Sequence, residues 1–131
     1  HLLKATPQKV PARFLISKRP EPARVVDLPP EGGKSVWGTL VLTPRGKARK
    51  VTFQYTLPAG IVSQTEEGFR YHLTLQKQAG TENVTAQVVV RLPPGGELLR
   101  AVPSPAGVKD DGRLVFNLSL LEDREVEVIF R

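Results

Sequence analysis

The sequence predicts an all-β domain, an immunoglobulin-like or Greek-key antiparallel β-sandwich of seven to nine strands. Segments in which apolar and polar residues alternate recur about every ten residues, as short strands do. The 12 Pro and 11 Gly residues separate these segments, and no stretch with a period of 3.6 is long enough for a helix. Because a sheet with one apolar face must bury that face, two packed layers are expected. A barrel is the alternative.

The domain itself is placed at residues 31–131, which suffice for one hydrophobic core. Residues 1–30 form a poorly organised, proline-rich lead-in. Within it, residues 12–16 and 23–28 are expected to form short edge strands, where a missing N–H is tolerated. The chain begins with His1 and contains no Met, so we expect it to be a piece of a longer protein.

The strand pattern becomes clear from Lys34 onward. Residues 34–43 are predicted to form a strand with a bulge at Gly38, and the next strand follows a turn at residues 44–47. The sequence Asp110-Asp111-Gly112 is typical of a hairpin turn. The other predicted strands cover residues 51–57, 69–76, 84–92, 97–102, 114–120 and 126–130. In these strands the apolar register contains six aromatic residues that are expected in the core: Phe53, Tyr55, Phe69, Tyr71, Phe116 and Phe130.

The chain has a formal net charge of +6, with basic residues concentrated in residues 4–24 and in the run at residues 45–50. A solvated surface is the simpler interpretation of this excess, and attraction of a polyanion is the alternative. Arg45, Lys47 and Arg49 are therefore candidate contact residues. Nucleic acid is not expected as a partner, because single-strand binders expose aromatic residues among the basic ones and here the aromatics occupy the apolar register.

Residues for catalysis or metal binding do not converge in the sequence, so no enzyme activity, catalytic residue, metal or cofactor is expected. The chain has no Cys, and His72 stands alone in the polar register of a strand. No Gly-x-Ser-x-Gly motif or phosphate-binding glycine pattern is present. Three carboxylate pairs lie in predicted turns that are short for Ca²⁺: Glu66/Glu67, Asp110/Asp111 and Glu122/Asp123. No run of 18 apolar residues exists, so direct membrane insertion of this fragment is not expected.

Four short motifs carry a resemblance to a known family. They are GKSVWG at residues 33–38, VTFQYTLP at 51–58, LQKQAGT at 75–81 and LPPG at 92–95. In this order they resemble the C-terminal region of a bacterial family of membrane-anchored, extracytoplasmic proteins of unknown function. The resemblance covers about residues 31–131 and departs from the family at Ala79 and at Arg45-Gly46, both in turns. It implies an extracytoplasmic location in the cell envelope, and it provides no catalytic residue that could be carried over to this chain.

Gln76, Lys77 and Gln78 form the most distinctive part of these motifs. The preferred interpretation is a structural role, in which the glutamines satisfy backbone groups at the end of the strand. Contact with a glycan or an anionic wall polymer is the alternative. The leading hypothesis is a non-catalytic scaffold, spacer or interaction module of an exported envelope protein. A carbohydrate-binding or wall-polymer-binding module and an accessory domain of a larger envelope enzyme are the alternatives. Envelope polysaccharide, wall polymer or other envelope proteins are the corresponding partners.

Overall fold

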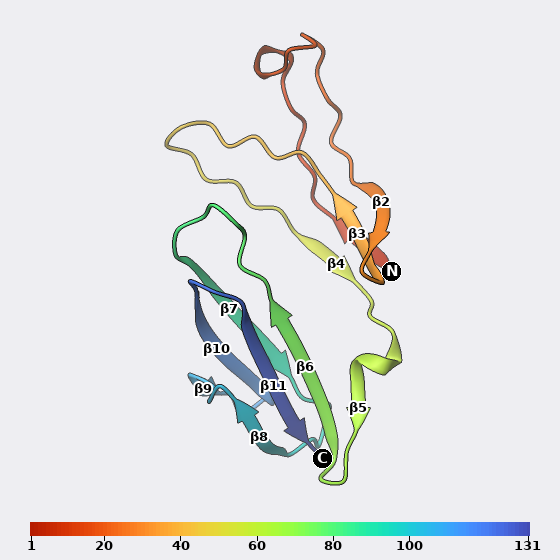
Figure 1. Cartoon of the computed structure of the whole chain (residues 1–131), viewed down its shortest axis with the longest axis vertical. Helices are drawn as coiled ribbons and strands as arrows, with labels where there is room; N and C mark the ends of the chain where they lie inside the picture. Colours follow the sequence, from red (N-terminus) through yellow and green to blue (C-terminus); the bar gives the residue numbers. More distant parts are fainter. The chain divides into compact units, whose positions relative to one another are not determined.

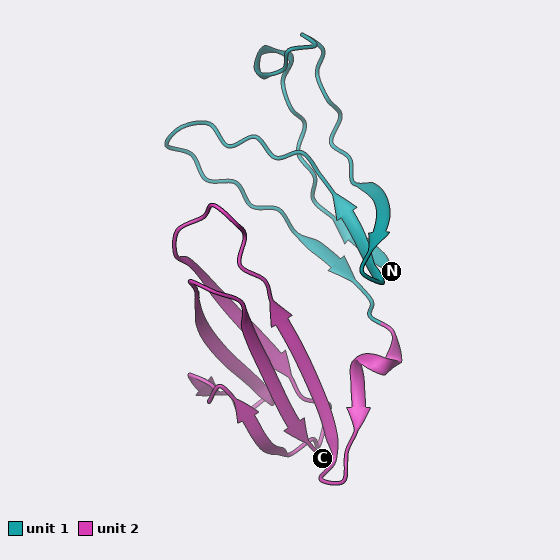
Figure 2. Cartoon of the chain, in the orientation of Figure 1, with its two compact units in different colours: residues 1–57 teal, residues 58–131 magenta.

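The computed structural model describes residues 1–131 and is all-β, which confirms the predicted fold class (Figure 1). It contains eleven strands, paired antiparallel throughout, and two 3₁₀ helices of three residues each. No helix has the length and apolar character needed to cross a membrane. The chain divides into two compact units, unit 1 at residues 1–57 and unit 2 at residues 58–131 (Figure 2).

Unit 2 contains two antiparallel sheets and the 3₁₀ helix η2 (Ala59–Ile61). The first sheet has four strands in the order β5 (Val62–Gln64), β6 (Phe69–Leu75), β11 (Arg124–Phe130) and β8 (Leu98–Val102). The second has three strands in the order β7 (Val84–Arg91), β10 (Arg113–Leu120) and β9 (Gly107–Val108). The unit therefore holds seven strands in two sheets.

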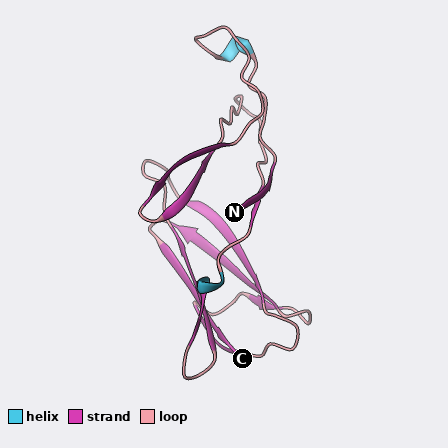
Figure 3. Ribbon diagram, turned by 90° about the vertical axis from the view of Figure 1, so that its right-hand side faces the viewer, coloured by secondary structure: helices cyan, strands magenta, loops and turns pink.

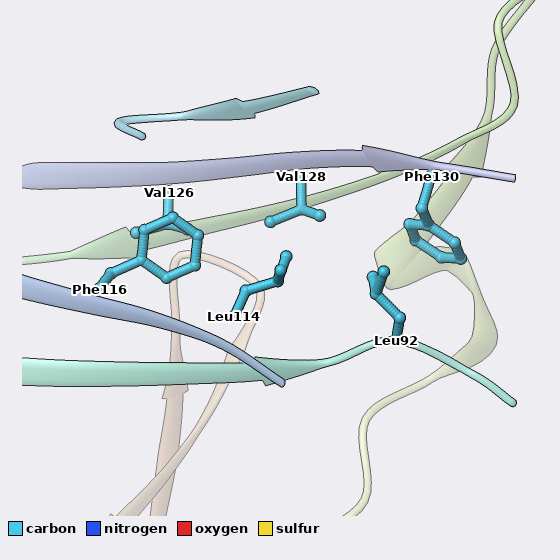
Figure 4. Packing of buried hydrophobic residues seen from close by; sticks show 6 residues of the cluster. All are labelled: Leu92, Leu114, Phe116, Val126, Val128 and Phe130. Carbon is cyan, nitrogen blue, oxygen red and sulfur yellow. The ribbon is translucent and has the colours of Figure 1, made fainter. Parts of the chain in front are cut away.

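The core of unit 2 lies between these two sheets (Figure 4). Alternation in β11 turns Val126, Val128 and Phe130 to one face of its sheet, as expected for a half-buried strand. In Figure 4 they point toward Leu114 and Phe116 of β10, and Leu92 completes the buried cluster. Six buried side chains from facing sheets make unit 2 a two-layer sandwich.

In unit 2 the chain changes sheet four times, and two of these changes involve its four longest strands. At one of these changes the chain passes from β6 to β7, and at the other from β10 to β11. The four strands then pair within their sheets, β6 with β11 in one sheet and β7 with β10 in the other. The second strand of the unit thus lies beside its last strand. In the constant-type immunoglobulin order the second strand lies beside the fifth instead.

Unit 1 contains two separate two-stranded ribbons. One pairs β1 (Leu2–Ala5) with β4 (Phe53–Tyr55), and the other pairs β2 (Val26–Glu31) with β3 (Lys34–Gly38). The sequence suggested a domain boundary between residues 30 and 31, which falls inside the β2–β3 hairpin. The rings of Trp37 and Tyr55 lie 5.4 Å apart and join the two ribbons.

Several predicted strands of unit 1 are shorter than expected or absent. Where an edge strand was predicted for residues 12–16, the structure has the 3₁₀ helix η1 (Ala12–Phe14) followed by a turn. Pro11 accepts a hydrogen bond from the Phe14 N–H, and no neighbouring strand offers a ladder. The strand predicted for residues 34–43 ends at Gly38, where its partner strand begins at Val26. Before Val26 the opposing segment contains Pro20 and Pro22, which have no N–H to donate.

The prediction that all six aromatic residues belong to the core is wrong for three of them. Phe53, Tyr55 and Phe69 have relative exposures of 36%, 48% and 46%. Phe53 and Tyr55 lie on β4, which belongs to a two-stranded ribbon and so has no second sheet to cover its apolar face. By contrast, Phe116 and Phe130 are buried.

Candidate functional site

Positive charge is divided very unequally between the two units. Unit 1 holds 11 of the 19 Lys and Arg residues and 3 of the 13 Asp and Glu residues, which gives it a formal charge of +8. Unit 2 has a formal charge of −2. The excess of +6 in the whole chain therefore belongs entirely to unit 1. A surface of this kind attracts polyanions over long distances.

The basic side chains of the two units also differ in their partners. All arginines of unit 2 form ion pairs with carboxylates of the same unit: Arg70, Arg91, Arg100, Arg113, Arg124 and Arg131. In unit 1, the only ion pair joins Arg24 to Glu21 at 3.5 Å. The other basic side chains of unit 1 have no carboxylate partner, so their charges are available to an external anion.

The densest part of this charge lies in the loop at residues 39–52, between β3 and β4. A turn closed by the Lys47 N–H and the Pro44 carbonyl, 3.0 Å apart, exposes Arg45 and Lys47, and Arg49 is exposed just beyond it. Gly46 has φ = +70°, which this turn requires. The turn keeps the three sequence-predicted cations on one short segment.

The base of this loop is tied to the first residues of the chain. The Gln8 side-chain amide donates to the Lys50 carbonyl at 3.2 Å. Thr52 and Thr6 exchange two bonds: the Thr52 N–H donates to the Thr6 hydroxyl at 2.8 Å, and the Thr6 N–H donates to the Thr52 carbonyl at 3.0 Å. Lys50 is exposed beside these contacts. The loop therefore presents four cations within six residues from a hydrogen-bonded base.

The second group of sequence-predicted residues, Gln76 to Gln78, lies in unit 2 at the end of β6. The Lys77 ammonium donates to the carbonyls of Gln78 at 3.1 Å and of Thr81 at 2.6 Å. The Lys77 N–H donates to the Asp123 carboxylate at 2.8 Å. Lysine, rather than the glutamines, thus satisfies the backbone groups of this turn. Gln76 and Gln78 are exposed, and this group and the loop at residues 39–52 belong to different units.

Two of the three carboxylate pairs contribute to turns of unit 2. Asp111 contacts Arg113 at 2.7 Å and Arg91 at 3.4 Å, and the hydrogen bond from Arg113 lowers the pKa of its carboxyl. Glu122 pairs with Arg124 at 3.1 Å, while its neighbour Asp123 accepts the Lys77 N–H. The structure contains no cluster of three or more His, Asp and Glu side chains in a geometry for a metal ion.

His72 lies on the outer face of the four-stranded sheet, within a row of charged side chains. Its Nε2 atom is 3.5 Å from the Glu125 carboxylate. Beside it, Glu127 pairs with Arg70 at 2.6 Å and with Arg100 at 3.4 Å across the neighbouring strands. Such cross-strand pairs are typical of the solvent-facing side of an antiparallel sheet.

A cleft of unit 2, of about 620 Å³, opens at one edge of the sandwich between β8 and β10. Its walls are mainly apolar, with Val102, Phe116 and Leu118 among them. The charged groups at its mouth are already engaged, because Arg124 donates to the Ser119 carbonyl and Asp123 accepts from Lys77. Of its other polar side chains, Asn117 bonds to Gln87, Ser119 bonds to Asn83, and Glu125 lies 3.5 Å from His72. Most polar groups of the cleft thus have partners within the protein.

The loop at residues 11–20 is a further basic segment of unit 1. It lies within the basic region noted at residues 4–24 and contains the edge strand predicted for residues 12–16. Arg13, Lys18 and Arg19 are exposed on it. The absence of Asp and Glu before Glu21 is the signal in the sequence that marks it. Comparisons of the chain with protein-family models, with curated proteins and with solved structures found no match.

Proposed function

We propose that the chain is a non-catalytic binding module of an exported bacterial envelope protein, in which unit 1 binds an anionic polymer and unit 2 provides a folded support. The observation that carries the proposal is the division of charge, +8 in unit 1 against −2 in unit 2. All the arginines of unit 2 are paired internally, whereas most cations of unit 1 have no partner.

The distribution of these cations favours a polymer over a small anion. They are spread along exposed loops and do not converge in an enclosed pocket, so no single phosphate or carboxylate would be held by several of them at once. A polymer with repeating negative charges, such as a wall polymer with phosphate in its backbone, would contact many of them together. Its release of counterions on binding makes the affinity depend on salt.

The envelope location rests on the four motifs and on the family that they resemble. In the structure, the motif at residues 33–38 forms the β2–β3 turn and β3, and the motif at residues 75–81 forms the turn held by Lys77. The motif at residues 51–58 contains β4 and spans the boundary between the units. These motifs therefore form strands and turns, whereas the proposed binding residues lie mainly in the loops between the motifs.

A pair of matched triple variants tests the proposed binding. Arg45→Gln/Lys47→Gln/Arg49→Gln removes three charges from unit 1, and Arg91→Gln/Lys109→Gln/Arg131→Gln removes three from unit 2. Binding of each chain to long-chain inorganic polyphosphate is measured by calorimetry over a range of salt concentrations. We expect the unit 1 variant to bind more weakly, with the slope of log K against log salt smaller by roughly two units. The unit 2 variant should bind as the unmodified chain does.

Three outcomes contradict the proposal. They are the absence of binding, binding that is insensitive to salt, and equal weakening of binding by the two triple variants. Single-stranded DNA serves as a second probe, because Phe53 and Tyr55 are exposed close to the basic loop in the sequence. Tighter binding to the DNA than to polyphosphate at the same salt concentration would identify nucleic acid, and not a wall polymer, as the partner.

A further inference from the structure

The loop at residues 11–20, which we call the tip loop, lies at the end of unit 1 remote from its two ribbons (Figures 1 and 3). Its neck is closed by a pair of backbone hydrogen bonds between Val10 and Glu21, at 3.1 and 3.0 Å, and Val10 is the one buried residue of unit 1. Inside the loop, η1 and a turn from Leu15 to Lys18 add three more backbone bonds. The tip loop thus has a defined backbone.

Two large apolar side chains project from the tip loop. Ile16 has a relative exposure of 102% and Phe14 of 43%. Between them, Leu15 is half-buried and lines a groove of unit 1 with Val26 and Leu28. Transfer of a fully exposed Ile side chain from water to an apolar environment is favourable.

Cations surround these apolar side chains. The Arg13 guanidinium lies over the Phe14 ring, 4.8 Å from its centroid. Lys18 and Arg19 follow Ile16 directly, both exposed, and none of the three basic side chains forms an ion pair. No acidic residue precedes Glu21 at the neck. The tip loop is therefore apolar at its end and positive around it.

We propose that the tip loop docks on an anionic lipid surface. Phe14 and Ile16 enter the boundary between headgroups and acyl chains, while Arg13, Lys18 and Arg19 contact lipid phosphates. Apolar side chains beside a basic collar are the combination by which peripheral segments bind anionic bilayers. This docking needs no spanning segment, since only side chains at the tip leave the water.

The charge and exposure of the tip loop favour lipid over a protein partner. At the centre of a protein interface, a side chain usually fills a shaped pocket of the partner, and a polar rim surrounds this centre. Here the collar has a single sign, and the most exposed apolar group is the aliphatic side chain of Ile16. A fluid surface with dispersed negative charge is complementary to both features. The inference is independent of the polymer-binding loop at residues 39–52.

The test uses the full chain and sedimentation with vesicles of phosphatidylcholine, with and without phosphatidylglycerol. We expect binding only to the vesicles that contain phosphatidylglycerol. Ile16→Ser should lower the partition coefficient roughly tenfold, because the aliphatic side chain no longer enters the bilayer. The matched control is Leu121→Ser, which removes an exposed aliphatic side chain from a turn of unit 2 and should leave binding unchanged.

A charge variant tests the collar separately. Arg13→Gln/Lys18→Gln/Arg19→Gln should weaken binding to the anionic vesicles about fivefold for each charge removed. Equal sedimentation of the Ile16→Ser and Leu121→Ser chains would overturn the proposal, as would equal binding to both kinds of vesicle. Polyphosphate binding by the Ile16→Ser chain separates the two proposals, because polymer binding should persist when lipid binding is lost.

Discussion

At the scale of single residues, the basic side chains that the sequence singled out have different surroundings. Lys77 is half-buried and its ammonium bonds two carbonyls of its own turn. Arg45, Lys47 and Arg49 are exposed and form no ion pair. The four residues carry the same charge, so the sequence does not distinguish them. Their neighbours in the folded chain show that Lys77 has a structural role, whereas the other three charges remain available.

Lys77→Met should destabilise unit 2 by about 1–2 kcal/mol, because two carbonyls lose a charged donor at a partly exposed site. Urea denaturation followed by circular dichroism measures the change, with an unchanged slope against urea showing that the unfolded state is unaffected. Lys109→Met, at an exposed lysine without an ion pair, should change the stability by less than about 0.5 kcal/mol. Equal losses of stability in the two variants would contradict a structural role for Lys77.

At the scale of elements, alternation in the sequence located the strands best where a second sheet covers them. The strands predicted for residues 69–76, 84–92 and 126–130 match β6, β7 and β11 to within two residues. Those predicted for residues 34–43 and 51–57 shorten to β3 and β4. Alternation marks which side chains would share a face, but a strand persists only where a neighbour pairs with its backbone.

The turn between β5 and β6 contains a glycine that its neighbours require. Gly68 has φ = +150°, and a Cβ atom there would lie 2.5 Å from the Phe130 carbonyl oxygen. The Gly68 N–H donates to the Thr65 hydroxyl at 3.2 Å, while the Thr65 N–H donates to the Gly68 carbonyl at 2.7 Å. A larger residue would separate this turn from the end of β11.

Gly68→Ala should therefore destabilise unit 2 by about 3 kcal/mol or more, since backbone strain and a steric clash add. Gly80→Ala is the matched control: its φ is +75° and a Cβ atom meets nothing within 4 Å. It should cost only the strain of about 1–2 kcal/mol. Thermal unfolding of the two variants gives the comparison, and a smaller loss for Gly68→Ala would contradict the close approach.

At the scale of the whole molecule, the two units differ in how they are stabilised. Unit 2 encloses a cluster of six buried apolar residues between two sheets. In unit 1 only Val10 is buried, and large apolar side chains are exposed on both ribbons and both long loops. Burial of apolar surface is the main favourable contribution to folding, so most of the stability belongs to unit 2.

Amide hydrogen exchange of the full chain should show this difference. We expect the amides of β6, β10 and β11 to exchange only on global unfolding, and those of the β2–β3 hairpin to exchange through local opening at a lower free energy. Two-dimensional NMR after transfer to deuterated water resolves the two groups. Equal protection of β2 and β10 would show that unit 1 has a source of stability other than its own buried residues.

The fold class can be predicted from the sequence, because alternation with a period of two and regularly spaced Pro and Gly are local properties. The sequence also identified the basic run at residues 45–50, since charge does not depend on folding. The tertiary structure decided which strands receive a covering sheet, so that Phe116 is buried while Tyr55 is exposed. It also showed that unit 1 holds most of the unpaired cations and that Ile16 projects from a closed loop. Pairing and burial join residues distant in the chain, and no local pattern specifies them.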